Sequence, residues 1–313
     1  MRSNLFRTAC RSGIFVLGLA AVAVPAAQAQ GRFAGSFKAT LSPAPISMQP
    51  AATPGPPAMP ALTMALLGPA AQGAATTTNL FAQVAIGGGY TTVFSFVNTG
   101  ADTTTGNLVL TSDAGAPLRA SLSTTGAPAT VGSTFAISVP TGGSQVITAG
   151  PVNASDPTTT GWAAVVGSGG TLGGVATFQF VVGSALQTIV GVLSGNAVSA
   201  ATVPLNDNHT QNRDTGYAVA NTGTTNINVK VVLVNPDGSV LLSDNPPFLN
   251  PLAPGKHGAI FVWQELNNAN FQFQGSMVLI EQASQSFSVV ALVLNNGLFT
   301  AIPVIPGKPP GIN

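Results

Sequence analysis

The stretch Phe94-Ser95-Phe96-Val97-Asn98-Thr99-Gly100 decides how the rest of the sequence is interpreted, because it occurs twice. A shift of 123 residues places it on Tyr217-Ala218-Val219-Ala220-Asn221-Thr222-Gly223 without a gap. The match continues with Leu110 on Leu233. An internal repeat sets the architecture of a chain, so we expect two similar strand-rich units.

The first 29 residues have the features of a secretory signal peptide. Three arginines precede an apolar run from Gly13 to Val24, and Ala27-Gln28-Ala29 supplies the small residues that a signal peptidase accepts. The apolar run is shorter than the roughly 20 residues that span a bilayer. We therefore expect no transmembrane anchor. We expect a secreted chain that is extracellular, periplasmic or held at the cell surface.

Residues 30–78 differ from the rest by their many prolines, which interrupt helices and strands. This composition is typical of an extended linker with polyproline II character. The apolar segment Leu62-Thr63-Met64-Ala65-Leu66-Leu67 lies near the end of the linker. It is either part of a simple spacer or a short segment that docks on a partner or on the first unit.

Short apolar runs separated by Gly, Thr, Ser, Pro and Asp fill residues 79–199 and 200–306. This spacing favours a sandwich or a barrel. Later parts of the two units align at shifts of 113 and 114, and the second of these places Val175–Phe180 on Val289–Leu294. The sequence thus predicts an all-β fold of two tandem antiparallel β-sandwich domains, followed by a Pro/Gly-rich tail at 307–313.

Charged residues form only 6% of the chain, against about 25% in an average soluble protein. Without the leader arginines Arg2, Arg7 and Arg11, ten minus three leaves seven basic residues against nine acidic ones. A near-neutral chain lacks the clustered Lys and Arg that bind nucleic acid. Cys10, the single cysteine, lies in the leader, which excludes a disulfide framework and a thiolate metal site.

Catalysis by acid–base or nucleophilic chemistry needs titratable groups that lie together. The chain has two histidines, and its glutamates are Glu265 and Glu281. The first unit contains neither residue type, so the repeat does not duplicate an active site. Glu281 ends an apolar run, where we expect it to face water. We therefore expect that the protein is not an enzyme.

The densest polar segment runs from Asn206 to Asp214, at the junction between the two units. Asp207 and Asp214, together with asparagine side chains, could supply oxygen ligands to calcium. The spacing matches no calcium-loop signature, and a solvated linker also explains the composition. Asn208 and His209 of the same segment are candidate ligand-binding residues.

Aromatic side chains are candidates for stacking on sugar rings. Tyr217 takes the place of Phe94 in the repeat and Trp162 opens an apolar run, so we expect both in the core. Trp263 and Tyr90 each lie beside a turn and are better candidates for exposure. A single helical turn is expected at residues 263–266.

The repeated Asn-Thr-Gly strand ends, the Asn235-Pro236-Asp237-Gly238 turn and the Leu252-Ala253-Pro254-Gly255 turn resemble a large set of secreted bacterial proteins of unassigned function. Those proteins are built from Ig-like or fibronectin-III-like sandwich modules. The resemblance covers residues 79–306. It implies a fold and no activity, because the shared motifs specify turns and strand ends.

These features predict an exported, non-catalytic protein with a structural, adhesive or matrix role at the cell surface. A first alternative is a carbohydrate-binding module protein, with polysaccharide as the partner and Trp263, Tyr90 and the 206–214 segment as contacts. A second alternative is a self-assembling extracellular filament subunit, because uncharged strand edges do not discourage pairing between chains. Other surface proteins are further candidate partners.

Overall fold

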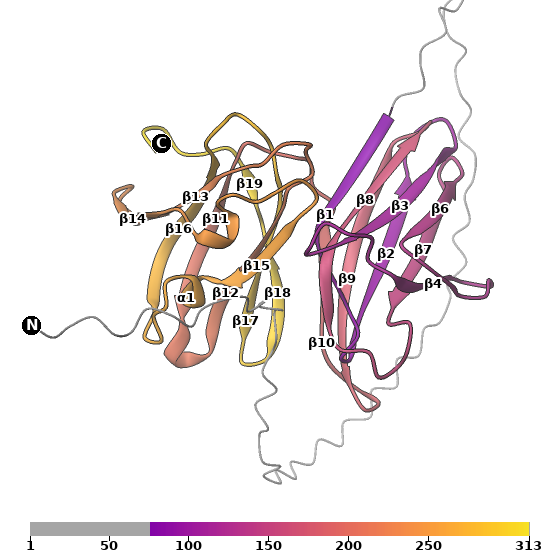
Figure 1. Cartoon of the computed structure of the whole chain (residues 1–313), viewed down its shortest axis with the longest axis horizontal. Coiled ribbons are helices and arrows are strands. Elements are labelled where there is room, and N and C mark those ends of the chain that lie inside the picture. Colours follow the sequence, from indigo (N-terminus) through magenta and orange to yellow (C-terminus); the bar gives the residue numbers. More distant parts are fainter. Residues whose placement is uncertain (1–75, 313) are drawn as a thin grey trace, which may run out of the picture. The chain divides into compact units, whose positions relative to one another are not determined.

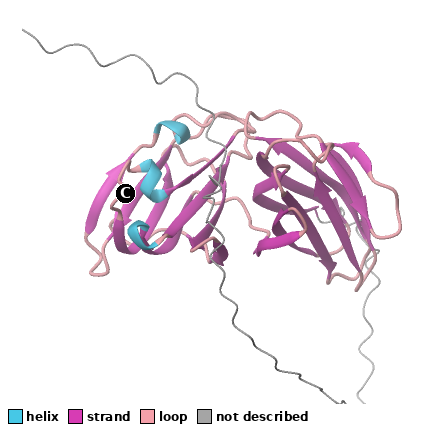
Figure 2. Ribbon diagram, turned by 90° about the horizontal axis from the view of Figure 1, so that it is seen from below, coloured by secondary structure: helices cyan, strands magenta, loops and turns pink. Residues whose placement is uncertain are grey.

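Strands make up nearly all of the regular secondary structure in the described part of the chain (Figures 1 and 2). A computed structural model describes residues 76–312, and these lie in one compact unit. The predictions for the leader, the linker and residues 62–67 fall outside the described residues. Three antiparallel sheets confirm the predicted all-β fold. No helix within residues 76–312 is long and apolar enough to cross a membrane.

The first two sheets come from residues 76–193. One has the order β1-β8-β3-β6, with β1 at Thr76–Ile86, β8 at Thr159–Ser168, β3 at Thr104–Ser112 and β6 at Thr134–Val139. The other has the order β10-β9-β2-β7-β4-β5, with β10 at Ala185–Leu193, β9 at Leu172–Val182, β2 at Tyr90–Asn98, β7 at Ser144–Gly150, β4 at Ala120–Thr124 and β5 at Thr130–Gly132.

One hydrophobic cluster joins these two sheets, and most of their strands contribute alternate residues to it. In β2, Phe94 and Phe96 are fully buried. Their rings lie 5.2 and 6.1 Å from the ring of Phe81 in the other sheet, in edge-on geometry. This packing of two sheets on a shared core is consistent with a sandwich.

The third sheet comes from residues 200–306 and has the order β14-β13-β16-β11-β12-β17-β18. Its strands are β14 at Val240–Asp244, β13 at Val229–Val234, β16 at Gln272–Glu281, β11 at Ala200–Asn208, β12 at Arg213–Ala220, β17 at Ser288–Asn295 and β18 at Leu298–Ile302, with β15 at His257–Phe261 on β12 and β19 at Ile305–Pro306 on β11. A second hydrophobic cluster is formed by residues of this sheet and of its connecting segments.

Three short helical segments complete the described part, namely η1 at His209–Gln211, η2 at Pro247–Leu249 and α1 at Val262–Glu265. The helical turn expected at 263–266 is thus confirmed within one residue. The predicted turn at 235–238 is also confirmed. The amide of Asn235 donates to the carbonyl of Ser239 at 2.8 Å and closes the β13–β14 hairpin.

The strand order of the first two sheets corresponds to that of the third. The series β1-β8-β3 parallels β11-β16-β13, and β10-β9-β2-β7 parallels β18-β17-β12-β15. Phe94 lies opposite Ala176, and Tyr217 lies opposite Ala291. Ala176 and Ala291 are therefore equivalent positions, 115 residues apart, and not 114 as the sequence alignment predicts. A shift of 114 would match side chains on one face of the sheet with side chains on the opposite face.

The order differs from that of an immunoglobulin domain. In the constant-type domain the first two strands are neighbours in one sheet. Here β1 lies beside β8, and β2 lies between β9 and β7 in the other sheet. Antiparallel sheets were predicted correctly, and the strand order was a property that the sequence left open.

Asn98 ends β2 with a buried side chain that fixes the following turn. Its amide nitrogen donates to the carbonyls of Asp102 at 2.7 Å and Val139 at 2.9 Å, and its oxygen accepts from the amide of Gly100 at 3.0 Å. Asn221 ends β12 with the same three bonds, to Thr225 O at 2.8 Å, Leu252 O at 2.9 Å and Gly223 N at 3.0 Å. The repeated asparagine thus has one structural role in both places.

The last residues are part of the fold. The predicted tail at 307–313 places Ile312 in a third hydrophobic cluster, together with Val232, Val234, Val278 and Ile280 on β13 and β16. The amide of Gly307 donates to the carbonyl of Ala200 at 2.8 Å. The tail therefore covers an apolar sheet face that a Pro/Gly-rich composition does not predict.

Candidate functional site

Four of the candidate residues come together where β11 turns into β12. We call Asp207, His209, Asp214 and Trp263 the hairpin-end cluster. The turn is made by η1 and by Asn212, which has a left-handed backbone with φ of 54°. Because α1 follows β15, which pairs with β12, Trp263 reaches the same end of the sheet.

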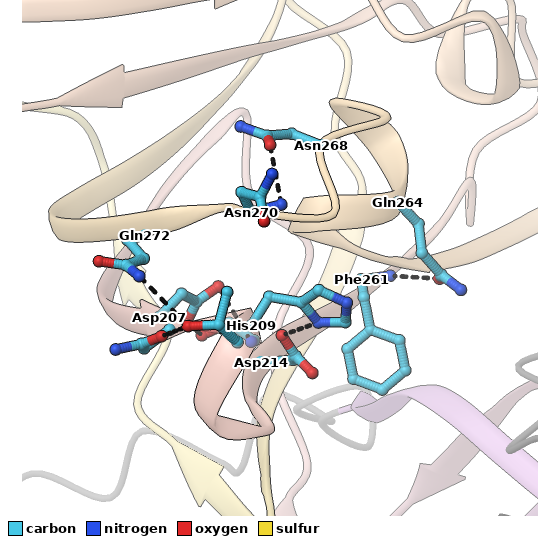
Figure 3. A network of polar contacts seen from close by, with 11 residues as sticks. Asp207, His209, Asp214, Phe261, Gln264, Asn268, Asn270 and Gln272 are labelled. Atoms are coloured by element: carbon cyan, nitrogen blue, oxygen red, sulfur yellow. Dashed lines mark hydrogen bonds and ion pairs between the residues drawn. The ribbon is translucent and has the colours of Figure 1, made fainter.

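His209 is held from two sides. Its Nδ1 lies 2.9 Å from Oδ1 of the nearly buried Asp214, and Figure 3 shows the ring and the carboxylate pointing toward one another. The imidazole also stacks on the indole of Trp263, with ring centroids 4.0 Å apart and an interplanar angle of 20°. One face of Trp263 is therefore occupied by a neighbour within the chain.

Asp207 is turned inward. The amide of Thr215 donates to its Oδ2 at 3.0 Å, and the Thr215 hydroxyl donates to its Oδ1. Burial raises the pKa of Asp207, and the bonds from Thr215 oppose this effect only in part. Within residues 76–312 no group of three or more His, Cys, Asp or Glu side chains is placed to hold a metal ion.

Amide and hydroxyl groups border the cluster. The hydroxyl of Thr210 donates to Oδ1 of Asn208 at 2.8 Å and accepts from Nε2 of Gln272 at 3.2 Å. Asn268 and Asn270 lie in the loop before β16, where the amide of Asn270 donates to Oδ1 of Asn268 at 3.0 Å (Figure 3). Asn208 is thus connected to its neighbours through uncharged amide and hydroxyl groups.

Beside the cluster, α1 also supplies a buried acid. The hydroxyl of the fully buried Tyr217 donates to Oε2 of Glu265, and Oε1 of Glu265 is buried without a partner. Burial raises the pKa of Glu265 to about 7, with the charge of Asp244 acting in the same direction. Chemically, this group is a proton donor or acceptor near neutral pH, enclosed within the protein.

Tyr90 lies in another sheet and is buried, against the expectation of exposure. Its ring stacks on Phe180 with centroids 4.6 Å apart, and its hydroxyl is buried without a hydrogen-bond partner. Burial raises the pKa of Tyr90 to about 12. The position beside the Gly87-Gly88-Gly89 turn suggested an exposed ring, whereas the neighbouring strand β9 covers it.

Two further expectations were wrong. Glu281 does not face water, because its carboxylate is buried and accepts the amides of Ala283 and Gln285, each at 2.7 Å. Trp162 is not in the core. It is half-buried, and its Nε1 donates at 2.7 Å to the carbonyl of Gly255, in the other half of the described chain.

Sequence reasoning missed a histidine–aspartate pair that links the two halves. Nδ1 of the buried His257 lies 2.8 Å from Oδ1 of Asp113, whose Oδ2 accepts the hydroxyl of Thr160 at 2.6 Å. Burial raises the pKa of Asp113, but the hydrogen bonds and the charge of His257 outweigh it, so that this pKa lies below its usual value. No sequence signal reveals a pair separated by 144 residues.

Comparisons with other proteins add no relative, because no family model, curated protein or solved structure matches this chain.

Proposed function

We propose that this chain is an exported, non-catalytic protein with a structural, adhesive or matrix role at the cell surface. The observation that carries the proposal is the use of its few titratable side chains. Asp207 binds Thr215, His209 binds Asp214 and Trp263, and Glu281 binds the following loop. Groups committed to holding loops and hairpins in place support a scaffold better than they support a reaction centre.

We infer that the scaffold consists of two sandwich modules derived from one repeated unit. This inference is supported by the matching strand orders and by the identical bonds of Asn98 and Asn221. Two modules joined into one compact body can present a binding surface to partners outside the cell. The leader-like segment at 1–29 supports export of the chain.

Complementation of a deletion strain tests the role. Removing the protein should reduce attachment or matrix cohesion of the producing cells, and protease treatment of intact cells should remove the exported chain. A Glu265→Gln variant removes an ionisable group while its amide oxygen can still accept the Tyr217 hydroxyl, and it should restore attachment as well as the unchanged chain does. A variant that is exported at normal levels but fails to restore attachment would contradict a non-catalytic role.

Carbohydrate binding is the second candidate, favoured by one observation. The half-buried Trp263 lies at the same end of the sheet as the amide side chains of Asn268, Asn270 and Gln272, and sugar sites combine an aromatic ring with amides. The stacked His209 occupies one face of the ring and counts against it. Trp263→Ala should weaken retention on a polysaccharide column if this candidate is right, and unchanged retention on every polysaccharide removes it.

A further inference from the structure

The outer face of β10, β9, β2 and β7 is uncharged and open. No strand from β1 to β10 contains Asp, Glu, Lys, Arg or His. On the side of this sheet opposite the core, four large apolar side chains are exposed, namely Val97 at 48%, Val146 at 40%, Ile189 at 49% and Leu193 at 79%. Most edges and faces of soluble sheets include charges that prevent association, and this one does not.

The side chains on this face form a continuous surface across four strands. Pairing places Leu193 beside Val175, Val175 beside Ser95, and Ser95 beside Val146. The next row along the strands contains Gly191, Thr177, Val93 and Thr148. Both rows consist of apolar, hydroxyl-bearing or glycine residues, so the face is a continuous surface without charge.

The corresponding face of the third sheet is already a packing surface. It is formed by β18, β17 and β12, where Val290, Leu292 and Phe299 pack against the core of the first two sheets. Ala218 and Ala220 on the same face are buried. The amide of Phe299 donates to the hydroxyl of Thr188 on β10 at 3.0 Å. The face of β18, β17 and β12 thus packs the second half of the described chain against the first.

We propose that the open face of β10-β9-β2-β7 is a self-association surface, whose occupant is the same face of a second copy of this chain. A twofold arrangement places the same exposed apolar patch of the two copies face to face. A second copy is the fitting partner because it has no charge to leave unpaired on contact, and because the chain already uses the corresponding face for sheet packing. The inference rests on the proposed structural role and specifies how copies interact.

The size of the face sets the strength that we expect. Four strands about 4.8 Å apart, over a length of roughly 20 Å, give on the order of 400 Å². Stable complexes bury about 800 Å² on each partner. The open face alone should therefore support a reversible dimer whose population rises with concentration, as suits a surface layer in which copies are held close together.

Sedimentation velocity of the purified exported chain over a concentration series tests the proposal. The unchanged protein should shift from the monomer mass toward twice that mass. A Leu193→Lys, Val146→Lys double variant should stay monomeric throughout, because like charges would then face each other across the interface. The matched control is Val240→Lys, Leu241→Lys on β14, which replaces two similarly exposed apolar residues and should dimerise like the unchanged chain.

Thiol reactivity provides a second readout that does not depend on the lysine variants. The only natural cysteine is Cys10, within the predicted leader. In a Leu193→Cys variant, modification by a thiol reagent should slow as the protein concentration rises. A monomer at all concentrations, dimers that persist in the face variant, or a thiol whose reactivity ignores concentration would each overturn the proposal. If one of these results is found and complementation is normal, the self-association surface is wrong and the structural role is unaffected. If complementation fails and the dimers are normal, the structural role is wrong and the self-association surface is unaffected.

Discussion

Asn98 and Asn221 illustrate how a single amide can define a strand end. Each is fully buried, and each satisfies two carbonyls and one amide of the turn that follows. An amide supplies both donors and an acceptor, which neither aspartate nor serine does. Both turns require two donors and one acceptor from a single side chain, which explains why asparagine occurs at both positions.

Replacing Asn221 should therefore be costly. Asn221→Ala leaves the carbonyl of Leu252 without its side-chain donor, and we expect a loss of about 2–4 kcal/mol in the free energy of unfolding. Urea unfolding measures this change. Asn196→Ala, at an exposed position, is the control and should change the free energy by less than about 0.5 kcal/mol. Equal effects of the two substitutions would show that the buried bonds add little.

Glu265 should make stability depend on pH near neutrality. Burial raises its pKa from the usual 4.5 to about 7, so the folded chain binds a proton more tightly than the unfolded chain. The stabilising effect of this proton is complete below about pH 4.5 and is lost as the pH rises through 7. The loss amounts to at most about 3 kcal/mol, because each tenfold difference in proton affinity corresponds to roughly 1.4 kcal/mol.

A neutral isostere removes this dependence. Glu265→Gln should unfold at a higher temperature than the unchanged chain at pH 8, with little difference at pH 4.5, as measured by thermal unfolding across the pH range. Asp102→Asn, in an exposed turn of the first half, serves as the control and should leave the pH profile unchanged. A profile that keeps its neutral slope in the Gln variant assigns the slope to another group.

At the scale of elements, strands are predictable and their neighbours are not. The first unit has eight apolar runs, at residues 79–86, 92–98, 107–111, 134–139, 145–148, 162–166, 175–182 and 188–193. All eight lie in strands, because alternation of apolar residues is a local property. The short strands β4 and β5 were missed, since Ala120–Thr124 and Thr130–Gly132 are only five and three residues long. The pairing of β1 with β8, like that of β2 with β9, depends on contacts between distant segments.

The candidate site shows the same limit. Composition correctly marked the 206–214 segment as polar, and the structure brings His209 to Trp263 across more than 50 positions of sequence. Whether an aromatic ring is exposed depends on what packs over it, as Tyr90 under Phe180 demonstrates. The role of Glu281 depends on a loop that folds back onto its carboxylate. Neither the burial of these side chains nor the identity of their partners follows from local sequence.

The C-terminal segment provides a test at this scale. Ile312 is buried against β13 and β16, so Ile312→Ala should remove about 2 kcal/mol or more from the free energy of unfolding and expose an apolar sheet face. Ile305→Ala, in the same segment but exposed, should be nearly neutral. Chemical unfolding compares the two variants. Identical midpoints would mean that the segment covers the sheet without stabilising it.

At the scale of the whole molecule, the joint between the halves combines polar and apolar contacts. Gly115 and Gly255 meet there backbone to backbone, since a Cβ on Gly115 would lie 3.3 Å from the carbonyl carbon of Gly255. Both glycines have positive φ, at 81° and 73°. The His257 and Asp113 side chains bond beside them. Two halves linked by one peptide segment alone could move independently, and these contacts hold them together.

A fixed joint predicts that the halves unfold together. Val290, Leu292 and Phe299 of the second half pack on the first core, so opening either half exposes apolar surface of the other. Calorimetry of the unchanged chain should therefore show one transition. A Leu292→Ala, Phe299→Ala double variant removes about 3–5 kcal/mol of shared packing and should separate the profile into two transitions.

Position, and not hydrophobicity alone, decides this outcome. Leu298→Ala with Ile305→Ala removes two exposed apolar side chains from the same region of the chain and should keep the single transition. If the joint variant also keeps a single transition at an unchanged midpoint, the packing of β17 and β18 on the first core does not couple the halves. The asparagine bonds and the separate cores would then stabilise each half independently.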